Sequence, residues 1–377
     1  MKITPFKLER YFAQYEFTTR YLLSSSDCEA LSLNEVLELA DEEARGLWRS
    51  LKLGYTESLG LPLLRAEIAQ LYAGISPEQV LVVVPEEGIF VALNCILESG
   101  DHVICTFPGY QSLYQVAASL GCVLSFWEPV EAEGWRFAPA FLERAIRPNT
   151  KLILCNFPHN PTGYLPTQEE WQNVLDVIGR RGIYLFSDEM YRFLELEPAD
   201  RLPSAVECYD KAITLFGMSK TFGMAGVRLG WLVTRDQALY QRMAAFKDYT
   251  TICASAPSEI LSLIALRARE GIISRHRGRI ARNLSLLDDF FQEHSEVMAW
   301  VRPRAGSICF PKLVGDVSAA ALCKALAEEA GVMLLPSTVY DYGDRHFRLG
   351  FGRESLPEAL LRFGEYLAGK YQPMRGA

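Results

Sequence analysis

The sequence lacks several features that would point to particular classes of protein. It has no run of about 18 apolar residues, and Met1–Arg10 contains no apolar stretch, so we expect neither a membrane span nor a signal peptide. Its five histidines are scattered without the paired spacing of a metal-binding helix, so we expect no catalytic metal. The formal net charge of −8 argues against a broad nucleic-acid surface.

The nine cysteines also lack the paired spacing of a metal site. Cys105 and Cys155 lie inside apolar runs, where cysteine behaves as a small buried hydrophobe. Free thiols and the absence of a targeting signal fit a reducing compartment, so we expect a cytoplasmic protein. With 377 residues, of which 49% are hydrophobic and 22% charged, the chain has enough material for a large globular core.

The middle of the chain alternates short apolar runs with helix-sized stretches. The runs are rich in Val, Ile and Leu without strict alternation, which is typical of strands buried on both faces of a mostly parallel sheet. The runs are Val80–Val84, His102–Thr106, Cys122–Phe126, Lys151–Asn156, Gly182–Ser187, Ala212–Gly217 and Arg228–Thr234. Helix-sized stretches between the earlier runs are Gly88–Leu97, Ser112–Leu120 and Thr167–Arg180. This order predicts an α/β fold with a seven-stranded, mostly parallel sheet sandwiched by helices. Because only ten residues separate the last two runs, we expect one antiparallel strand.

The two ends of the chain follow a different pattern. A long helical pattern after Pro257 continues through Phe291. Alternating strand-like and helical stretches follow it, namely Val297–Arg302, Ser307–Pro311, Val317–Ala330, Val332–Leu335, His346–Phe351 and Leu356–Tyr371. We therefore expect a small α+β domain over residues 257–377, joined by residues 1–45, and a large domain over residues 46–256. A ligand site is expected in the cleft between them.

Candidate functional residues follow the ends of the central strands. Lys220 lies just after the run Ala212–Gly217, and by position alone such a lysine is usually a solvated loop residue. Arg228 follows eight residues later, in a segment with two glycines. A lysine and an arginine at one edge of a sheet suit an anionic ligand, because the guanidinium binds phosphate through two parallel hydrogen bonds.

Polar side chains also end two other runs. Asp188 ends a buried run, where a carboxylate needs a cationic partner, although a helix N-cap is an equally good interpretation. Tyr191, three residues later, taken alone is an ordinary core residue. Asn160 lies beside two prolines after the run Lys151–Asn156, where the bland interpretation is a β-turn and the functional one is a rigidly held amide.

Together these segments resemble a known family. The pattern NxPxNPTG from Asn156, DExY from Asp188, and SK at Lys220 with GxR eight residues later resembles the fold-type I pyridoxal-phosphate enzymes of the class I/II aminotransferase family. The spacings, 28 residues from Asn160 to Asp188 and 32 from Asp188 to Lys220, are similar to that family too. The likeness extends from about Tyr55 to Arg348, which is most of the chain.

The resemblance implies pyridoxal 5′-phosphate as cofactor and a role for each matching residue. Lys220 would hold the cofactor as a Schiff base and then move a proton between the substrate and the cofactor. Asp188 would pair with the pyridine nitrogen, and Arg228 would bind the phosphate. Tyr191 and Asn160 would hydrogen-bond the phenolic oxygen of the ring.

Other positions match the family outside these motifs. Tyr110 falls where the family stacks an aromatic ring on the cofactor. Arg348 matches the arginine that holds the substrate α-carboxylate, with Asn160 nearby. Tyr55 matches a residue that reaches the phosphate of the neighbouring subunit, which implies a homodimer.

Two departures from the family pattern concern the phosphate. Where the family has a small glycine- or serine-rich turn, this chain has Glu86 and Glu87, whose backbone amides remain available while their carboxylates must point away from an anion. Gly217 stands where many members have a phosphate-binding serine, which leaves Ser219 as a candidate partner.

The substrate is less well specified than the cofactor. Ser26 and Asp27 lie in the segment where family members contact the substrate, and an acid there would select a polar or cationic side chain. A simple capping or turn motif is the competing interpretation. We find no assignable second arginine for a dicarboxylate, although Arg20 stays open.

Three functions remain at this stage. The favoured one is transamination between an amino acid and a 2-oxo acid. The second is another pyridoxal-phosphate reaction, such as elimination, cyclisation, decarboxylation or oxidation, in specialised amino-acid biosynthesis. The third is a non-catalytic binding domain of the same fold, which an intact Lys220 and the negative net charge disfavour.

Overall fold

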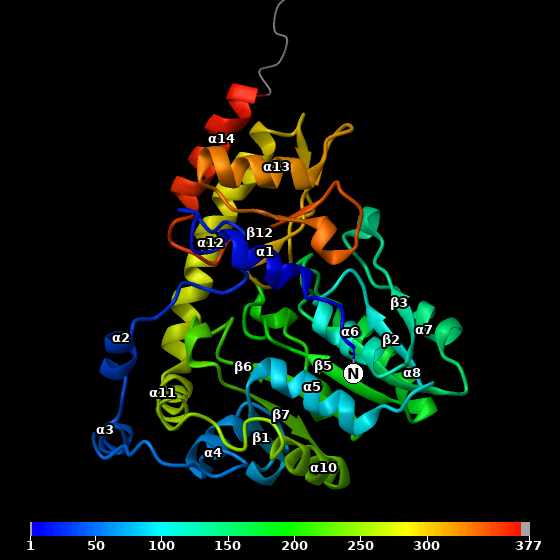
Figure 1. Ribbon diagram of the computed structural model, residues 1–377, viewed down its shortest axis with the longest axis vertical. Helices are drawn as coiled ribbons and strands as arrows, with labels where there is room; N and C mark the ends of the chain where they lie inside the picture. Colours follow the sequence, from blue (N-terminus) through cyan, green and yellow to red (C-terminus); the bar gives the residue numbers. More distant parts are fainter. Residues whose placement is uncertain (1, 371–377) are drawn as a thin grey trace, which may run out of the picture.

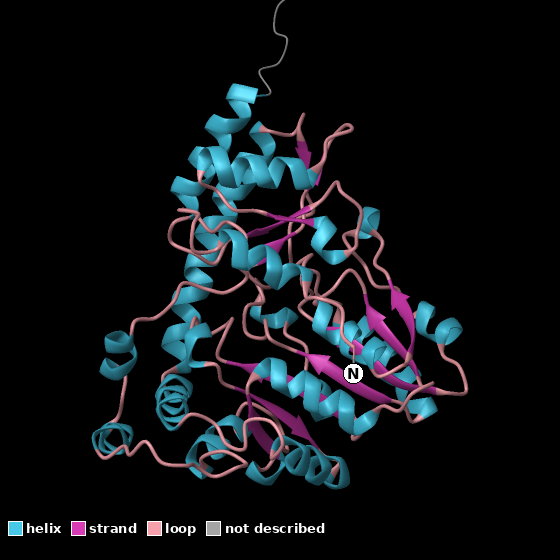
Figure 2. Cartoon of the chain, in the orientation of Figure 1, coloured by secondary structure: helices cyan, strands magenta, loops and turns pink. Residues whose placement is uncertain are grey.

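A seven-stranded sheet forms the centre of the larger, lower part of the molecule (Figures 1 and 2). The structure is a computed structural model and describes residues 2–370. The strands are β1 Val80–Val83, β2 His102–Thr106, β3 Val123–Trp127, β4 Thr150–Asn156, β5 Tyr184–Asp188, β6 Ala212–Gly217 and β7 Gly230–Thr234. Their order across the sheet is β1-β7-β6-β5-β4-β2-β3.

The strand directions confirm the mostly parallel sheet expected from the sequence. The neighbours β3, β2, β4, β5 and β6 run parallel, whereas β7 is antiparallel to both β6 and β1. The short connection between β6 and β7 holds only the 3-10 turn Ala225–Val227, so the chain returns directly beside the strand it has just left. This confirms the antiparallel strand that the ten-residue spacing predicted.

Helices cover both faces of the sheet, which explains its continuous apolar strands. On β4, Leu152 and Leu154 pack into one core cluster, while Ile153 and Cys155 pack into another on the opposite face. The helices of this part are α4 Pro62–Ala69, α5 Pro85–Ile96, α6 Gln111–Ser119, α7 Ala140–Ala145, α8 Gln168–Arg181, α9 Ala205–Cys208, α10 Gln237–Lys247 and α11 Ala256–Arg267. Burial on both faces is what removes the polar–apolar alternation from the strands.

A smaller α+β part lies above the sheet in Figure 1 and is reached by the long helix α12. Its helices are α12 Arg269–Glu293, α13 Ala319–Ala325 and α14 Leu356–Lys370, and its short strands are β8 Met298–Ala299, β9 Ile308–Cys309, β10 Lys312–Leu313, β11 Leu335–Pro336 and β12 Phe347–Gly350. The single helix expected after Pro257 is instead two, α11 and α12, because the backbone leaves the helical conformation at Ala268. Tyr371, the expected end of the last helix, lies outside the described residues.

The N-terminal segment is divided between the two parts. Its first helix, α1 Lys7–Tyr15, packs on the smaller part, whereas α2 Leu33–Glu38 and α3 Glu42–Arg49 pack against α11 of the larger part. Tyr21 exchanges backbone hydrogen bonds with Gly331 and Met333, and the Gly350 N–H donates to the Leu23 carbonyl. The domain boundaries at residues 45 and 256 stay a prediction. Across residues 2–370, no helix combines the length and apolar character that crossing a membrane requires.

Candidate active site

The candidate site lies at the carboxyl edge of the central sheet. Parallel strands bring their carboxyl ends to one edge, and that edge is where open α/β sheets bind ligands. Asn156 at the end of β4 pairs in register with Asp188 at the end of β5. Lys220 follows the end of β6 by three residues. The fold therefore brings together residues that are far apart in the chain.

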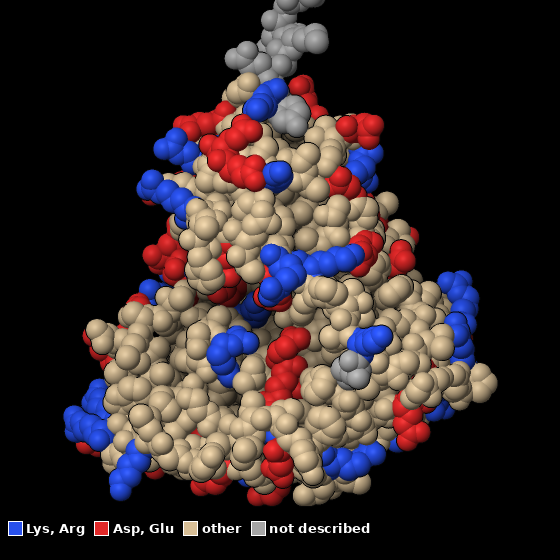
Figure 3. All heavy atoms as spheres, in the orientation of Figure 1, with Lys and Arg blue, Asp and Glu red and all other residues tan. Residues whose placement is uncertain are grey.

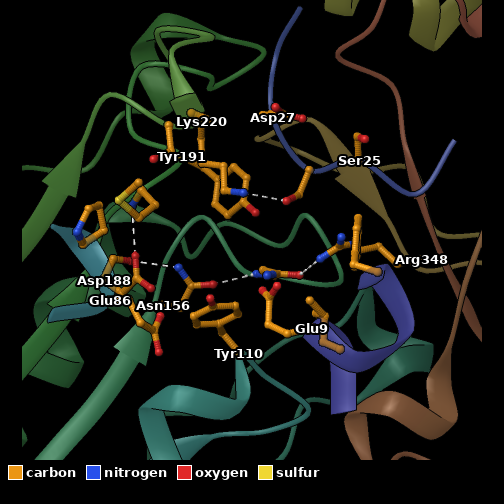
Figure 4. A pocket seen from close by; sticks show the side chains of 18 of the residues that line it. Glu9, Ser25, Asp27, Glu86, Tyr110, Asn156, Asp188, Tyr191, Lys220 and Arg348 are labelled. Atoms are coloured by element: carbon orange, nitrogen blue, oxygen red, sulfur yellow. Dashed lines mark hydrogen bonds between the residues drawn. The ribbon is translucent and has the colours of Figure 1, made fainter. Parts of the chain in front are cut away.

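A cavity of about 340 Å³ opens at this edge. Figure 3 shows the molecule hollowed at mid-height, with acidic and basic side chains around the hollow. The cavity is lined by most of the residues predicted from the sequence, namely Lys220, Asp188, Asn160, Tyr191, Arg228, Tyr110, Ser219, Glu86, Arg348, Ser26 and Asp27 (Figure 4). Tyr55 and Glu87 are the two predicted residues that do not line it.

Lys220 points into the cavity from the loop after β6. Its Nζ donates a hydrogen bond to Ser26 Oγ at 2.8 Å. Burial lowers the pKa of Lys220, and the positive charges of Arg348 and Arg228 lower it further, while Asp27 acts in the opposite direction. A lowered pKa makes a neutral, nucleophilic amine available at lower pH than for an exposed lysine.

Asp188 is a buried carboxylate on the floor of the cavity. It is 5% exposed, and its Oδ1 accepts a hydrogen bond from the Met190 N–H at 3.1 Å. Burial raises the pKa of Asp188 to about 7, because the charged form loses water. A cationic ring nitrogen placed beside Asp188 would restore the charged form.

Asn156 fixes the turn that carries Asn160. Its Nδ2 donates to the Asp188 carbonyl at 2.9 Å, and its Oδ1 accepts from the Asn160 N–H at 2.8 Å. The side chain thus ties the ends of β4 and β5 to the following loop. Sequence reasoning placed Asn156 in the motif but did not assign it this role.

Tyr191 carries a hydroxyl that protein contacts leave unsatisfied. The side chain is 3% exposed and lines the cavity, and its hydroxyl has no hydrogen-bond partner among residues 2–370. Buried polar groups are nearly always paired, so an unpaired one facing a cavity indicates a ligand partner.

Arg348 is a buried cation whose contacts within the described chain are all neutral. It is 2% exposed, and it donates to the Ser24 carbonyl at 2.8 and 3.2 Å, to the Tyr340 hydroxyl at 2.8 Å and to Asn160 Oδ1 at 3.3 Å. These contacts orient the guanidinium but do not balance its charge. Because a buried charge without a counterion is costly, the site favours an anion at this point.

Asp27 differs from the free acid that the sequence suggested. The Arg353 Nη2 contacts both of its carboxylate oxygens, at 2.9 and 3.0 Å. The charge of Asp27 is therefore compensated within the protein. Sequence reasoning missed Arg353, which lies three residues after β12 and 326 residues from its partner.

The two glutamates at the start of α5 differ in where their carboxylates lie relative to the cavity. The Glu87 carboxylate faces away from the cavity, accepting from the Val84 N–H at 3.1 Å and from the Thr251 hydroxyl at 2.7 Å. Glu86 is half-buried and lines the cavity, and burial raises the pKa of its carboxyl. Only one of the two acids is thus near the position expected for a phosphate.

Gly217 has a packing explanation. A Cβ atom added there would lie 2.9 Å from the Cα of Gly230, the first residue of β7, and 3.0 Å from the carbonyl oxygen of Leu229, which precedes that strand. A serine side chain has no room at this approach of two strands. Ser219, two residues later, lines the cavity instead.

The three remaining predicted residues differ in their relation to the cavity. Tyr110 lines the cavity at the start of α6. Arg228 lines it too, and its Nη1 donates to the Ala225 carbonyl at 3.1 Å. Tyr55 lies on the surface, where it is 90% exposed.

Helix α1 and its C-cap residue supply cavity residues that the sequence did not identify. Glu9, Phe12 and Glu16 all line the cavity, and Figure 4 shows Glu9 beside Tyr110 and Arg348. Their spacing of three and four residues places them on one helical face, which was the available signal.

Comparisons with known proteins agree with this geometry. Residues 21–362 match the family described as aminotransferase class I and II. Capreomycidine synthase of Streptomyces vinaceus is 26% identical over 96% of this chain and 93% of its own length. The probable aspartate/prephenate aminotransferase of Thermus aquaticus is 30% identical over 84% of each chain.

A solved structure is similar over nearly the whole chain. A PLP-dependent aminotransferase from Streptococcus suis 89-1591 has a TM-score of 0.92 and 31% sequence identity, over 98% of this chain and 99% of the other. Together with the match over residues 21–362, this shows that the chain belongs to the class I and II aminotransferases and is a pyridoxal-phosphate-dependent transferase.

Proposed function

We propose that Lys220 binds the cofactor covalently and that the cavity around it transfers an amino group between an amino acid and a 2-oxo acid. The observation that carries this proposal is the convergence of Lys220, Asp188 and Arg348 on one cavity at the carboxyl edge of the sheet. These residues supply an amine, a buried carboxylate and a buried cation.

The residues present fit pyridoxal phosphate. The unpaired Tyr191 hydroxyl suits the phenolic oxygen of the ring, together with the Asn160 amide. Asp188 is buried with a raised pKa, which a protonated ring nitrogen would lower by pairing with it. The ring face would pack against Tyr110.

Pyridoxal phosphate, when bound, withdraws electrons from the α-carbon of an amino acid and so makes its proton removable. Lys220 Nζ is the base that takes this proton and returns it, a role that requires the neutral amine. Its lowered pKa favours that form. Ser26 Oγ, which accepts from Nζ at 2.8 Å, holds the amine toward the cavity.

Arg348 would hold the substrate by its α-carboxylate. The Ser24 carbonyl and the Tyr340 hydroxyl fix the plane of the guanidinium, and a carboxylate would supply the negative charge that these contacts lack. An amino acid held there by its carboxylate would lie in the cavity that Lys220 also lines.

The phosphate would bind at the start of α5 and at Arg228. The first-turn amides of a helix are free to bind an anion, and here they include those of Glu86 and Glu87. The Glu87 carboxylate is already turned toward Thr251, so it does not repel the phosphate. Ser219 lines the cavity and would add a hydrogen bond.

We further propose a homodimer in which Tyr55 reaches the neighbouring site. Leu53, Tyr55 and Tyr249 are 88%, 90% and 91% exposed, which is unusual for large apolar side chains. A second copy of the chain would cover them. Tyr55 in that arrangement completes the phosphate site of its partner.

A second candidate reaction has specific support. The relative that covers 96% of this chain is named a synthase, and the same lysine, aspartate and arginine serve other pyridoxal-phosphate reactions on amino acids, including cyclisation. Mass spectrometry of the products with and without an added 2-oxo acid separates the two. Transamination requires the 2-oxo acid for turnover and converts it to an amino acid, whereas turnover without it would contradict transamination.

A further inference from the structure

Helix α1 and its C-cap residue Glu16 form one wall of the cavity, where two acidic side chains lie. Glu9 and Glu16 lie seven residues apart, about two helical turns or ~10 Å along the axis, with Phe12 between them on the same face. Figure 4 shows Glu9 projecting from this helix toward the cavity. All three precede residue 21, where the match to the family begins, so membership of the family does not account for them.

Contacts at both ends hold α1 against the rest of the protein, and at its last residue the Tyr15 hydroxyl donates to Glu328 Oε1 at 3.4 Å. Lys7 forms an ion pair with Asp341, and its backbone N–H donates to Gln111 Oε1 at 2.9 Å. Leu8 and Tyr15 are buried on the inner face of the helix. The two acids are therefore held at the cavity wall rather than on a free chain end.

The charges that line the cavity are not all compensated. The acidic residues are Glu9, Glu16, Asp27, Glu86 and Asp188, and the basic residues are Lys220, Arg228, Arg348 and Arg353. Asp27 and Arg353 pair with each other. Within residues 2–370, the side chains of Glu9 and Glu16 make no ion pair or hydrogen bond.

The proposed function gives a partner to the other charged groups except Glu86, whose carboxylate is hydrogen-bonded by Ser112 and Tyr110. Asp188, Lys220 and Arg228 bind the cofactor, and Arg348 binds the substrate carboxylate. The buried, unpaired Tyr191 hydroxyl and the uncompensated Arg348 show independently that this cavity is built for a ligand. Glu9 and Glu16 are the acids on the substrate side that remain without a role.

The position of α1 relative to Arg348 indicates what the acids meet. The Arg348 guanidinium lies 5.9 Å from the centre of the Phe12 ring, so the wall begins beside the proposed carboxylate site. An amino acid held by Arg348 must extend its side chain along the remaining walls. Burial and the neighbouring carboxylates of Glu9 and Asp27 raise the pKa of Glu16, while Arg353 and Lys220 act in the opposite direction. The pKa stays raised overall, and a further cation bound beside Glu16 would lower it.

We propose that Glu9 and Glu16 bind the cationic side chain of the amino acid substrate. The enzyme then prefers amino acids with a guanidinium or ammonium group over neutral ones, and it disfavours acidic ones because the same wall repels them. The inference rests on the proposed function, because Arg348 must hold the carboxylate for the side chain to reach α1.

The test measures equilibrium binding of two unreactive ligands to the cofactor-loaded protein. 5-Guanidinopentanoate and 5-ureidopentanoate have the same shape and carboxylate and lack the α-amine, but only the first is cationic. We expect wild type to bind the guanidino compound about tenfold more tightly, a ratio that calorimetric dissociation constants resolve. In E9Q/E16Q we expect the ratio to fall below about twofold while the affinity for the ureido compound is unchanged.

A matched control and a separate readout make the outcome decisive. Glu293→Gln makes the same chemical change on an exposed site of α12, and it should leave the tenfold ratio intact. A ratio near one in wild type, or a ratio that survives in E9Q/E16Q, overturns the inference. Visible absorbance of the loaded protein, lost in Lys220→Ala, reports the proposed function independently. If the absorbance is present and the discrimination absent, only the inference fails; if wild type shows no absorbance, both fail.

Discussion

Replacing Asp188 with Asn should stabilise the cofactor-free protein while it impairs the loaded enzyme. Asp188 is buried, and among the described residues its carboxylate accepts one hydrogen bond, from the backbone N–H of Met190. An asparagine keeps that acceptor and removes the charge. The variant therefore separates the electrostatic cost of the carboxylate from its structural contact.

The magnitude follows from the pKa of Asp188. Burial raises that pKa from its ordinary value of 3.8 to about 7. Because one pH unit corresponds to ~1.4 kcal/mol, the charged carboxylate costs the folded protein up to about 4 kcal/mol at pH above 7. The folded pKa is the higher one, so this cost is absent below 3.8, grows as pH rises through the interval, and is constant above about 7.

Urea unfolding of the cofactor-free proteins at several pH values measures this difference. We expect the free energy of unfolding of Asp188→Asn to exceed that of wild type by an amount that grows by about 2 kcal/mol between about pH 5.5 and pH 7. Above about pH 7.5 the difference should be constant. Adding pyridoxal phosphate should then stabilise wild type more than the variant. The protonated ring nitrogen pairs with the carboxylate of Asp188, whereas the asparagine of the variant has no charge to pair with it.

Two results would refute this reasoning. A stability difference that does not change with pH would mean that Asp188 is not the group that titrates. A variant less stable than wild type at about pH 8 would mean that the carboxylate already has a favourable partner in the free protein.

Other predictions concern the substrate clamp, the lysine and the subunit contact. Arg348→Lys should raise KM for amino acids by about tenfold or more, because an ammonium cannot replace the two-point contact with a carboxylate; steady-state kinetics measures this, and an unchanged KM would contradict it. Asp27→Asn should shift the pH midpoint of cofactor capture downward, since Asp27 raises the pKa of Lys220; stopped-flow absorbance measures the midpoint, and an upward shift would count against it. Mixing Tyr55→Ala subunits with Lys220→Ala subunits should restore activity, because Tyr55 of one subunit then serves Lys220 of the other; mixed dimers that stay inactive would exclude this arrangement.

Much of the large part of the fold could be predicted from the sequence for a physical reason. Strands buried on both faces carry apolar residues at every position, so β2 and β6 begin and end at the predicted residues. Shorter strands of the smaller part were less predictable. The expected strand Val297–Arg302 is only β8, two residues long, because it pairs with β10 over two residues.

In the candidate site too, residues placed by local sequence could be predicted, whereas contacts between residues far apart in the chain could not. Lys220, Asp188 and Asn160 follow strand ends, where local sequence places them at one edge of the sheet. The pairing of Asp27 with Arg353 spans 326 residues, and no local pattern indicates it. The role of α1 likewise depends on where the N-terminal helix packs, which its own nine residues do not specify.

The central claim is that Lys220 is the lysine that holds the cofactor. The most direct measurement is borohydride reduction of the loaded protein, followed by mass spectrometry of its peptides. We predict that the reduced cofactor is attached to the peptide that contains Lys220 and is absent from Lys220→Ala. Lys247 provides an internal comparison, because it is also buried and its pKa is also lowered by burial. Attachment to Lys247 or to another lysine, or no attachment at all, would contradict the account.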